Sequence, residues 1–330
     1  MEERLCWGIL GTATIAVDQV IPAMLDAAYC KIVAIASRSE ARAKEVAQKF
    51  GIAKSYGDYS FLLEDPKVQA VYIPLPNHLH VEWAIKALRA SKHVLVEKPI
   101  ALHKNEALQL AEEIKAHPRL KVMEAFMYKF HPQWVKTKQM VDDGQIGHLK
   151  MVQASFSFFE DDSNSIVNNK SFGGGSLMDI GCYPVSVSRF LFGAEPKFVF
   201  SNLEYDPDSQ VDIHASGTLE FEQGQAIFFS SIRLAEHQEV KLFGTQGSIE
   251  LELPFNPHGD RMARIWWSKD AVRKEIAIPQ SNQYTLQVDA FSKAILNKGG
   301  LPFSLDDAIA NMAVIDALVE SDRLGKAIAP

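Results

Sequence analysis

The sequence is poor in cysteine. Its 330 residues include three cysteines, Cys6, Cys30 and Cys182, which lie far apart and form no CxxC pair. An odd number of widely spaced thiols indicates neither a disulfide framework nor a zinc site. We therefore expect reduced thiols that are buried as small hydrophobic side chains.

Long apolar runs and an excess of positive charge are also lacking. Apolar stretches such as residues 68–81 are short and contain proline, asparagine and histidine, so no membrane-spanning helix is predicted. The formal net charge of −7 disfavours a protein that binds the phosphate backbone of nucleic acids. The first ten residues carry acidic side chains where an export signal needs positive charge. We expect a cytoplasmic protein with no nucleic-acid or membrane partner.

What the chain has is the composition of an ordinary globular protein, 47% apolar and 23% charged. Its length exceeds the usual size of one hydrophobic core, which predicts two domains. Up to residue 125, short apolar runs alternate with helical patterns, as in βαβ units on a parallel sheet. The expected strands are residues 5–10, 31–36, 69–73, 93–96 and 120–124, and the expected helices are residues 39–50 and 104–116. Residues 1–125 are thus predicted to form a doubly wound α/β domain.

Residues 126–330 show a different pattern, which predicts an α+β domain with a large open, mainly antiparallel sheet. The expected strands are period-2 or aromatic-rich and are joined by glycine turns, at residues 149–159, 211–221, 225–234, 238–243 and 248–253. Such strands favour an antiparallel sheet with one covered face. Helical patterns return at residues 283–297 and 305–323, and the C-terminal helix could pack back on the first domain.

The first expected strand leads into a glycine-containing turn with the sequence GILGTATIA, residues 8–16. It reads as GxGxxG with alanine at the second and third glycine positions, between a strand and a helix. Gly11 permits the tight turn, and the helix N-terminus offers free N–H groups to a pyrophosphate. The expected dinucleotide contacts are Gly11, Thr12, Ala13, Thr14 and Ile15. An ordinary turn between a strand and a helix is the alternative.

Ser37 and Arg38 follow the second expected strand. A cofactor without a 2′-phosphate would usually meet an acidic side chain here. The Arg38 guanidinium instead suits a phosphate and can stack on adenine, which favours NADP over NAD. A solvated arginine at the beginning of a helix is the competing interpretation.

The next three expected strands also end in polar segments. The first of these segments, residues 74–80, is a rigid turn with two prolines, from which Pro74, Pro76, Asn77 and His80 are expected to contact the cofactor. Glu97 and Lys98 follow the next strand, and Tyr128 and His131 follow the last. Because the carboxyl ends of parallel strands share one edge, where ligands bind, we expect these segments to line one crevice. No third ligand accompanies His78 and His80, so no metal is expected.

Three glycines, residues 173–175, precede a helical pattern that carries Asp179 and Tyr183. Side chains four apart share one face of an α-helix, and a carboxylate beside a phenol can act as an acid-base pair. Pro184 indicates an irregular helix, because it has no N–H to donate to the carbonyl of Ile180. A glycine loop with a helix cap and a packed tyrosine is the alternative.

In this order and spacing, the motifs GTATIA, PNHLH, EKP, EAFMYKFHP and GGGSLMDIGCY resemble the glucose-fructose oxidoreductase, inositol dehydrogenase and MocA (Gfo/Idh/MocA) family of nicotinamide-dependent oxidoreductases. The match covers essentially the whole chain. It implies an N-terminal Rossmann domain and a C-terminal sheet that often serves oligomerisation, hence a homodimer or higher homo-oligomer. Tyr183 stands where many members have histidine, which resembles the branch of dimeric dihydrodiol dehydrogenases and NADP-dependent D-xylose dehydrogenases.

The resemblance implies hydride transfer between NADP and the CH–OH or carbonyl carbon of a sugar or cyclic diol. Lys98, Asp179 and Tyr183 would be the catalytic residues, and the substrate would meet these three together with Tyr128 and His131. Tyr183 would move the hydroxyl proton. A phenol's reference pKa is about 10, and the neighbouring charge of Lys98 would favour the phenolate. The alternative is a catalytically silent NAD(P)-binding regulatory or sensor protein. An S-adenosylmethionine methyltransferase leaves Lys98 and Tyr183 unexplained.

Overall fold

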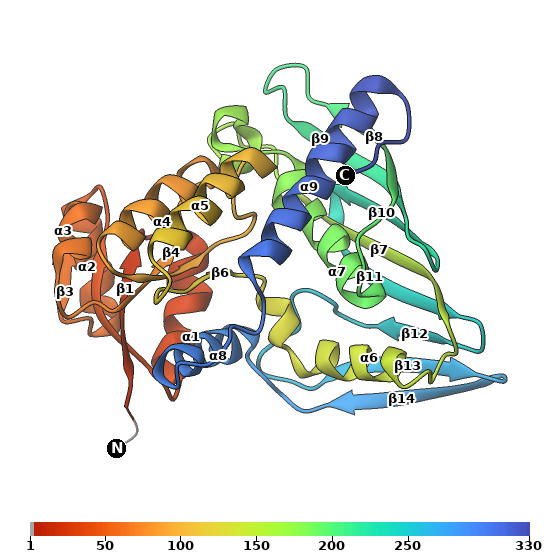
Figure 1. Ribbon diagram of the computed structural model, residues 1–330, viewed down its shortest axis with the longest axis horizontal. Helices are drawn as coiled ribbons and strands as arrows, with labels where there is room; N and C mark the ends of the chain where they lie inside the picture. The colour runs from red at the N-terminus through yellow and green to blue at the C-terminus, as the bar shows by residue number, and fades with distance from the viewer. Residues whose placement is uncertain (1–2) are drawn as a thin grey trace. The chain divides into compact units, whose positions relative to one another are not determined.

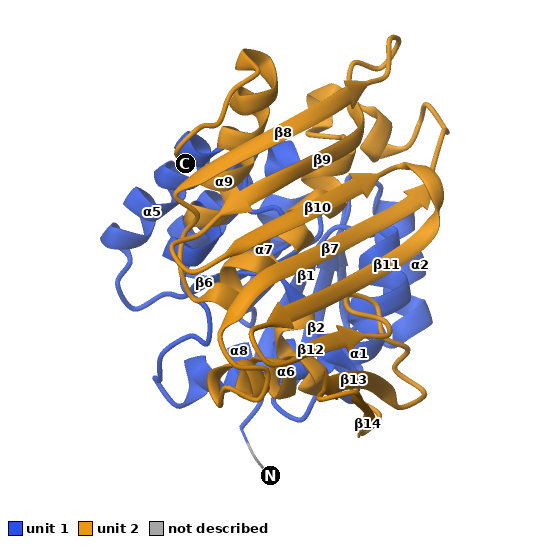
Figure 2. Ribbon diagram, turned by 90° about the vertical axis from the view of Figure 1, so that its right-hand side faces the viewer, with its two compact units in different colours: residues 1–127, 282–309 blue, residues 128–281, 310–330 orange. Residues whose placement is uncertain are grey.

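The computed structural model describes residues 3–330. The chain forms two compact units, each built from two segments (Figure 2). The first comprises the residues up to Met127 and Asn282–Ile309, and the second comprises Tyr128–Ser281 and Ala310–Pro330. The sequence predicted a division at residue 125 and placed everything beyond it in the second domain. The structure differs in the segment Asn282–Ile309, which packs with the N-terminal unit.

A parallel six-stranded sheet forms the centre of the first unit (Figure 1). Its order is β3-β2-β1-β4-β5-β6, a doubly wound Rossmann arrangement whose order reverses beside β1. The strands are β1 (Leu5–Leu10), β2 (Cys30–Ala36), β3 (Lys54–Tyr56), β4 (Ala70–Ile73), β5 (His93–Val96) and β6 (Val122–Glu124). The sequence predicted five of these, and the short strand β3 was missed.

Helices cover the sheet of the first unit. They are α1 (Ile21–Asp26), α2 (Glu40–Phe50), α3 (Tyr59–Glu64), α4 (His80–Arg89), α5 (Lys104–Ala116) and α8 (Gln283–Leu296), with a π-helix at Ala16–Val20 and a 3₁₀ turn at Asn77–Leu79. Helix α2 shows how the sequence sets the ends: the Ser39 hydroxyl accepts the N–H of Arg42, and Gly51 closes the helix at φ 67°. Trp7 of β1 donates its indole N–H to Ser292 of α8 at 3.1 Å, which joins the late segment to the first strand.

An eight-stranded sheet, in the order β14-β13-β12-β11-β7-β10-β9-β8, forms the second unit (Figure 2). The strands are β7 (Leu149–Phe159), β8 (Phe198–Tyr205), β9 (Asp212–Glu220), β10 (Gln225–Ser231), β11 (Arg233–Gly244), β12 (Ser248–Leu251), β13 (Ala263–Lys269) and β14 (Val272–Ile278). On one face lie α6 (Pro132–Asp142), α7 (Cys182–Phe192) and α9 (Leu305–Leu324), as Figure 1 shows. Short 3₁₀ turns occur at Met127–Phe130, Ile166–Asn168 and Lys170–Phe172.

The expected, mainly antiparallel sheet is confirmed, and within residues 3–330 its one parallel pair is β7 with β10, from Met151 with Gln225 to Ser157 with Ser231. The other neighbouring pairs in this sheet are antiparallel. Between β7 and β10 the chain passes through α7 and the β8–β9 pair, so β10 returns to β7 by a long crossover, which parallel pairing requires. The C-terminal helix α9 belongs mostly to the second unit, and α8 is the late helix that packs on the first.

Candidate active site

Gly11 closes the turn after β1 in a conformation that favours glycine. Its φ is +136°, and a Cβ added there would lie 3.2 Å from the Cδ2 of Leu75 in the loop after β4. Its N–H donates to the carbonyl of Ala36 at the end of β2. The loops after three neighbouring strands therefore meet around Gly11, and Thr12, Ala13, Thr14 and Ile15 lead from it into the π-helix Ala16–Val20. The positive φ of Gly11 agrees with the tight turn that the glycine motif predicted.

The segment after β2 contains one buried and one exposed candidate. Ser37 is buried, and its hydroxyl lies 3.4 Å from the Thr12 hydroxyl and accepts the N–H of Ser39 at 3.3 Å. Arg38 is exposed, and its charge acts on Tyr59. Burial nevertheless raises the pKa of Tyr59, because it outweighs the charge of Arg38. Arg38 thus lies at the same sheet edge as Gly11 and presents a guanidinium to solvent.

His80 has a different place from the one expected. It is fully buried at the start of α4, with Nδ1 2.7 Å from the Pro99 carbonyl and Nε2 2.7 Å from the Leu75 carbonyl. Burial lowers its pKa to about 4, so the neutral ring donates to one of the two carbonyls. Both nitrogens face backbone within the first unit, so His80 ties the loops after β4 and β5 together and its expected contact with a cofactor is corrected. Asn77 and Pro76 in the same turn are partly exposed.

Glu97 and Lys98 lie at the end of β5, as predicted. The Glu97 carboxylate accepts the Tyr72 hydroxyl at 2.7 Å and the Lys98 N–H at 3.2 Å, which fixes the course of the chain at this point. Lys98 is partly exposed and precedes a cis peptide bond to Pro99. The N–H of Ile100 donates to Glu124 at the end of β6 at 2.7 Å. Lys98, whose backbone is fixed by these hydrogen bonds, thus lies at the sheet edge where parallel sheets bind ligands.

Tyr284, which the sequence analysis missed, lies near this lysine. It is in the first turn of α8, and its pKa is raised above the usual range, first by burial and then by the charge of Glu97, while Lys98 opposes the rise. The charges act on Tyr284 because α8, nearly 190 residues away in sequence, belongs to the first unit. Its single sequence signal was the Asn282 cap, whose side chain accepts the N–H groups of Tyr284 and Thr285.

In the second unit, Asp179 and Tyr183 lie on a bent helical segment. The π-helix Leu177–Gly181 contains Asp179 and runs directly into α7, whose second residue is Tyr183. The change from π-helical to α-helical winding therefore takes place between Asp179 and Tyr183, which are four residues apart. Pro184 is part of the reason, since it has no N–H for the Ile180 carbonyl, and the predicted irregularity is confirmed.

Aromatic side chains surround Tyr183. Its ring lies 5.1 Å from that of Phe255, 5.6 Å from that of Phe156 and 5.9 Å from that of Tyr128, and the side chain is 5% exposed. Asp179 is half-buried. The packed tyrosine that the sequence left open as an alternative therefore describes the surroundings of the Tyr183 ring. Packing of this kind holds the ring in one orientation.

Two other expected substrate contacts are buried within the second unit. Tyr128 is 0% exposed, and its hydroxyl lies 2.8 Å from the Ser186 hydroxyl. His131 is 1% exposed and caps α6, where its Nδ1 accepts the Gln133 N–H at 3.2 Å. Burial lowers the pKa of His131 to about 4. In this structure both residues pack and position other groups, which corrects the expectation that they contact substrate directly.

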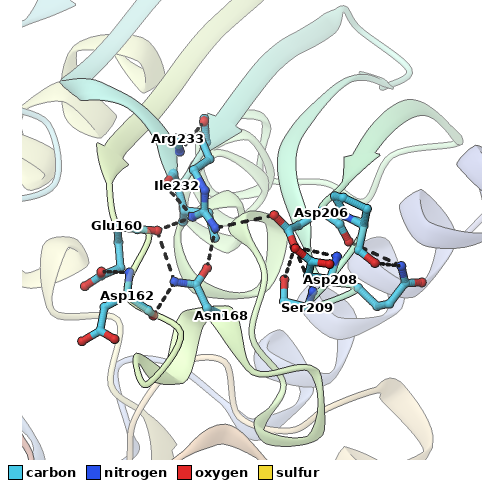
Figure 3. Close-up of polar contacts among 11 residues, drawn as sticks. Glu160, Asp162, Asn168, Asp206, Asp208, Ser209, Ile232 and Arg233 are labelled. Carbon is cyan, nitrogen blue, oxygen red and sulfur yellow. Dashed lines mark hydrogen bonds and ion pairs between the residues drawn. The ribbon is translucent and has the colours of Figure 1, made fainter.

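The course of residues 160–172, which the sequence could not predict, is set by Arg233 at the start of β11 (Figure 3). Its guanidinium donates to the Glu160 carbonyl and to Asn168 Oδ1, the latter at 2.9 Å, and lies 4.0 Å from Asp206. Asn168 in turn donates to the carbonyls of Glu160 and Asp162. The loop is thereby closed on itself just before the glycines that lead to Asp179.

The candidate residues therefore fall into two sets, one in each unit. The first set has the features of a dinucleotide site: a glycine turn, an arginine at the next strand end and a lysine beyond β5. The second offers a carboxylate and a phenol. Within residues 3–330, no three His, Cys, Asp or Glu side chains are grouped to hold a metal ion. None of the helices in that range is both long and apolar enough to cross a membrane.

Comparison with known proteins identifies relatives of the whole chain. Residues 5–126 match the model of an oxidoreductase family with an NAD-binding Rossmann fold, and residues 134–250 match the GFO/IDH/MocA C-terminal domain. An uncharacterized oxidoreductase of Rhizobium meliloti is 42% identical, covering 97% of each chain. An NADP⁺-dependent D-xylose 1-dehydrogenase of Haloferax volcanii is 35% identical, covering 98% of this chain and 99% of its own. The structure of a 3-ketoreductase from Actinomadura kijaniata with NADP and TDP-benzene has a TM-score of 0.91 at 29% identity, covering 97% of this chain and 98% of its own.

Proposed function

This chain belongs to the GFO/IDH/MocA family of oxidoreductases, and we propose that it is an NADP-dependent enzyme that transfers hydride between nicotinamide and the CH–OH or carbonyl carbon of a sugar or cyclic diol. One observation carries the proposal. Gly11, Arg38 and Lys98 lie beyond the carboxyl ends of β1, β2 and β5 of one parallel sheet, at the edge where such sheets bind dinucleotides. The D-xylose dehydrogenase and the 3-ketoreductase support the cofactor and the substrate class.

The first unit suits a dinucleotide at the turn after β1. Gly11 allows the turn after β1 to pack against Leu75, where a Cβ would be crowded. The residues from Thr12 to Ile15 lead into a helical segment whose N-terminal N–H groups suit a pyrophosphate. The exposed Arg38 guanidinium suits a 2′-phosphate. The loops that His80 ties together would contact the nicotinamide end of the cofactor through Pro74, Pro76, Asn77 and Glu97. NADP, when bound, supplies or accepts the hydride.

The chain's own residues must move the proton. In the oxidative direction the substrate hydroxyl loses its proton as the carbonyl forms, and Tyr183 takes it as general base. The cationic Lys98 favours the phenolate and hydrogen-bonds the substrate oxygen. In the reductive direction Tyr183 returns the proton. Asp179, half-buried on the adjoining turn, orients substrate hydroxyls.

A substrate panel tests this function. Purified protein is titrated with NADPH and NADH by fluorescence and is then assayed with aldoses, ketoses and cyclic diols. We expect tighter binding of NADPH and cofactor-dependent turnover of at least one carbinol. Tight NADPH binding with no turnover across the panel would favour the alternative, a catalytically silent sensor.

We also propose a homodimer formed through the open face of the second unit's sheet (Figure 2). Phe198 and Phe200 on β8 are 47% and 45% exposed, and Ile227 and Phe229 on β10 are each 38% exposed. Paired strands place Phe200 in one row with Ile227, across Thr218. An apolar face of this kind favours self-association.

Light scattering tests the dimer. The wild-type protein should have twice the chain mass at micromolar concentration, and replacing both Ile227 and Phe229 with lysine should give monomers. Phe61→Lys, at a 58% exposed phenylalanine of the first unit, is the matched control and should leave the dimer intact. A wild-type monomer would refute the assignment.

A further inference from the structure

A buried carboxylate that the proposed mechanism does not use lies beneath the helical segment carrying Asp179 and Tyr183. Asp212 is the first residue of β9 and is 8% exposed. Aspartates are rarely buried unless they are paired. Burial raises the pKa of Asp212 to about 7, because it outweighs the hydrogen bonds that the carboxylate accepts. Because burying a carboxylate is unfavourable, Asp212 is expected to have a structural or functional role.

The hydrogen-bond donors to Asp212 come from the beginning of that helical segment. The N–H of Leu177 donates to Oδ2 at 2.7 Å, and the Ser176 hydroxyl lies 3.0 Å from the same oxygen. The Ser176 hydroxyl also lies 3.1 Å from the hydroxyl of Ser230 on β10. Two sheet strands therefore hold the first turn of the segment. Such contacts satisfy N–H groups that a helix start otherwise leaves without a partner.

Both ends of the π-helix Leu177–Gly181 are pressed against the same two strands. A Cβ added to Gly175, whose φ is +111°, would lie 2.1 Å from Asp212 Oδ1. A Cβ added to Gly181 would lie 2.8 Å from the Ser230 hydroxyl. The backbone thus comes closer to β9 and β10 than a residue with a side chain allows. The position of the segment is fixed by contact at both ends and by charge-assisted hydrogen bonds at one.

The residues that this anchoring would position are the proposed acid-base pair. Asp179 is in the middle of the π-helix, and Tyr183 comes two residues after its end. The aromatic rings around Tyr183 restrict the orientation of its side chain, but they do not fix the position of the helical segment along the sheet. Asp212 supplies that restraint. Catalytic groups displaced by about 1 Å commonly lose roughly a hundredfold in rate.

We infer that Asp212 is a positioning residue, which holds the turn Ser176–Gly181 against β9 and β10 and thereby sets the places of Asp179 and Tyr183. The inference rests on the proposed function for its effect on rate. Its structural part does not, because anchoring of the turn is measurable in a protein of any activity.

The test compares Asp212→Ala and Asp212→Asn with Asp322→Asn. Asp322 is a matched control in the same unit, since it lies on α9 and its carboxylate accepts the backbone N–H of Leu203 at 2.8 Å. We expect Asp212→Ala to lower kcat at least tenfold, with the Kd for NADPH unchanged. Asp212→Asn should lose less, because its amide oxygen still accepts the Leu177 N–H.

Hydrogen exchange gives the readout that is independent of activity. Peptides covering residues 176–187 should exchange at least tenfold faster in Asp212→Ala than in wild type, and at the wild-type rate in Asp322→Asn. Wild-type exchange and wild-type kcat in Asp212→Ala would overturn the inference, as would equal losses in the control. If the wild-type protein turns over no substrate, the proposed function fails, and the exchange rates still decide whether Asp212 anchors the turn. If Asp212→Ala does not fold, the same exchange rates and kcat are measured on Asp212→Asn.

Discussion

The two sheets of this chain expose their residues differently. Every residue of β4 in the first sheet is buried, whereas β8 and β10 in the second alternate between exposed and buried positions. A parallel sheet with helices on both faces can offer polar groups only beyond its strand ends, and there Gly11, Arg38 and Lys98 are found. The second sheet has one face for a helix that carries Asp179 and Tyr183, and another that is open.

In the proposed mechanism the two units have different chemistry: the first binds the cofactor and supplies a cation, and the second supplies the acid-base group. This division is therefore tested by changes that separate binding from turnover. A residue of the first unit other than Lys98 that affected turnover alone, or one of the second that governed NADPH affinity, would break this division.

Lys98→Met should have the largest effect. It removes the cation beyond β5 while keeping the length of the side chain, so we expect kcat to fall roughly a thousandfold, in the range typical of lost acid-base and electrostatic assistance. NADPH should still bind, because Gly11 and Arg38 are unchanged. Fluorescence titration and steady-state assays on the same preparation measure both quantities, and full activity would remove Lys98 from the mechanism.

Acid should weaken the first unit through His80. Its pKa of about 4 in the folded protein is below the usual 6.5, so the stability that it contributes is present above pH 6.5 and is lost as the pH falls towards 4. For a fully buried ring the shift corresponds to about 3 kcal/mol. Burial likewise lowers the pKa of His93 on β5 and of His131 in the second unit.

The second unit should show the opposite pH dependence and lose stability as the pH rises. The pKa of Asp212 is raised from 3.8 to about 7, so the stability linked to its protonation is complete below pH 3.8 and is lost as the pH rises through 7. Hydrogen exchange of β4 and β9 peptides between pH 5 and 8 checks both signs. Equal pH dependence of the two strands would contradict the assignment of these groups.

Arg38→Ala should have a smaller and more selective effect. Losing one charge-assisted contact to a 2′-phosphate costs about 2 kcal/mol, or roughly thirtyfold in NADPH affinity, with little change for NADH. Arg42→Ala is the matched control, because Arg42 is an exposed arginine of α2 that pairs with Glu45. Equal losses for the two cofactors would show that Arg38 does not read the phosphate.

Local signals predicted much of this fold. Strands β1, β5 and β7 and helices α2 and α5 occur within a residue of their expected ranges, since alternation, caps and glycine stops act over a few residues. Four strands were missed, namely β3, β8, β13 and β14. Two of them lack those signals. Strand β14 is mostly exposed and reads VRKEIAI, and β3 has only three residues, so pairing with neighbours decides both.

Site residues could be predicted where the sequence pattern of a single strand end indicated them. They could not be predicted where segments distant in sequence come together. Gly11 and Lys98 follow their own strands. His80 was given the wrong role because its carbonyl partners come from two other loops, and Asp212 was missed because its donors lie 35 residues away in sequence. The parallel pairing of β7 and β10 is of the same long-range kind.

In the proposed mechanism, Lys98 lowers the pKa at which Tyr183 works as a base. The most direct measurement is the pH dependence of kcat/KM in the oxidative direction for wild type, Lys98→Gln and Tyr183→Phe. Wild type should show a basic group titrating well below the phenol's reference pKa of about 10, and Lys98→Gln should move that titration towards about 10. Tyr183→Phe should lack it. The same titration in all three proteins would contradict the account.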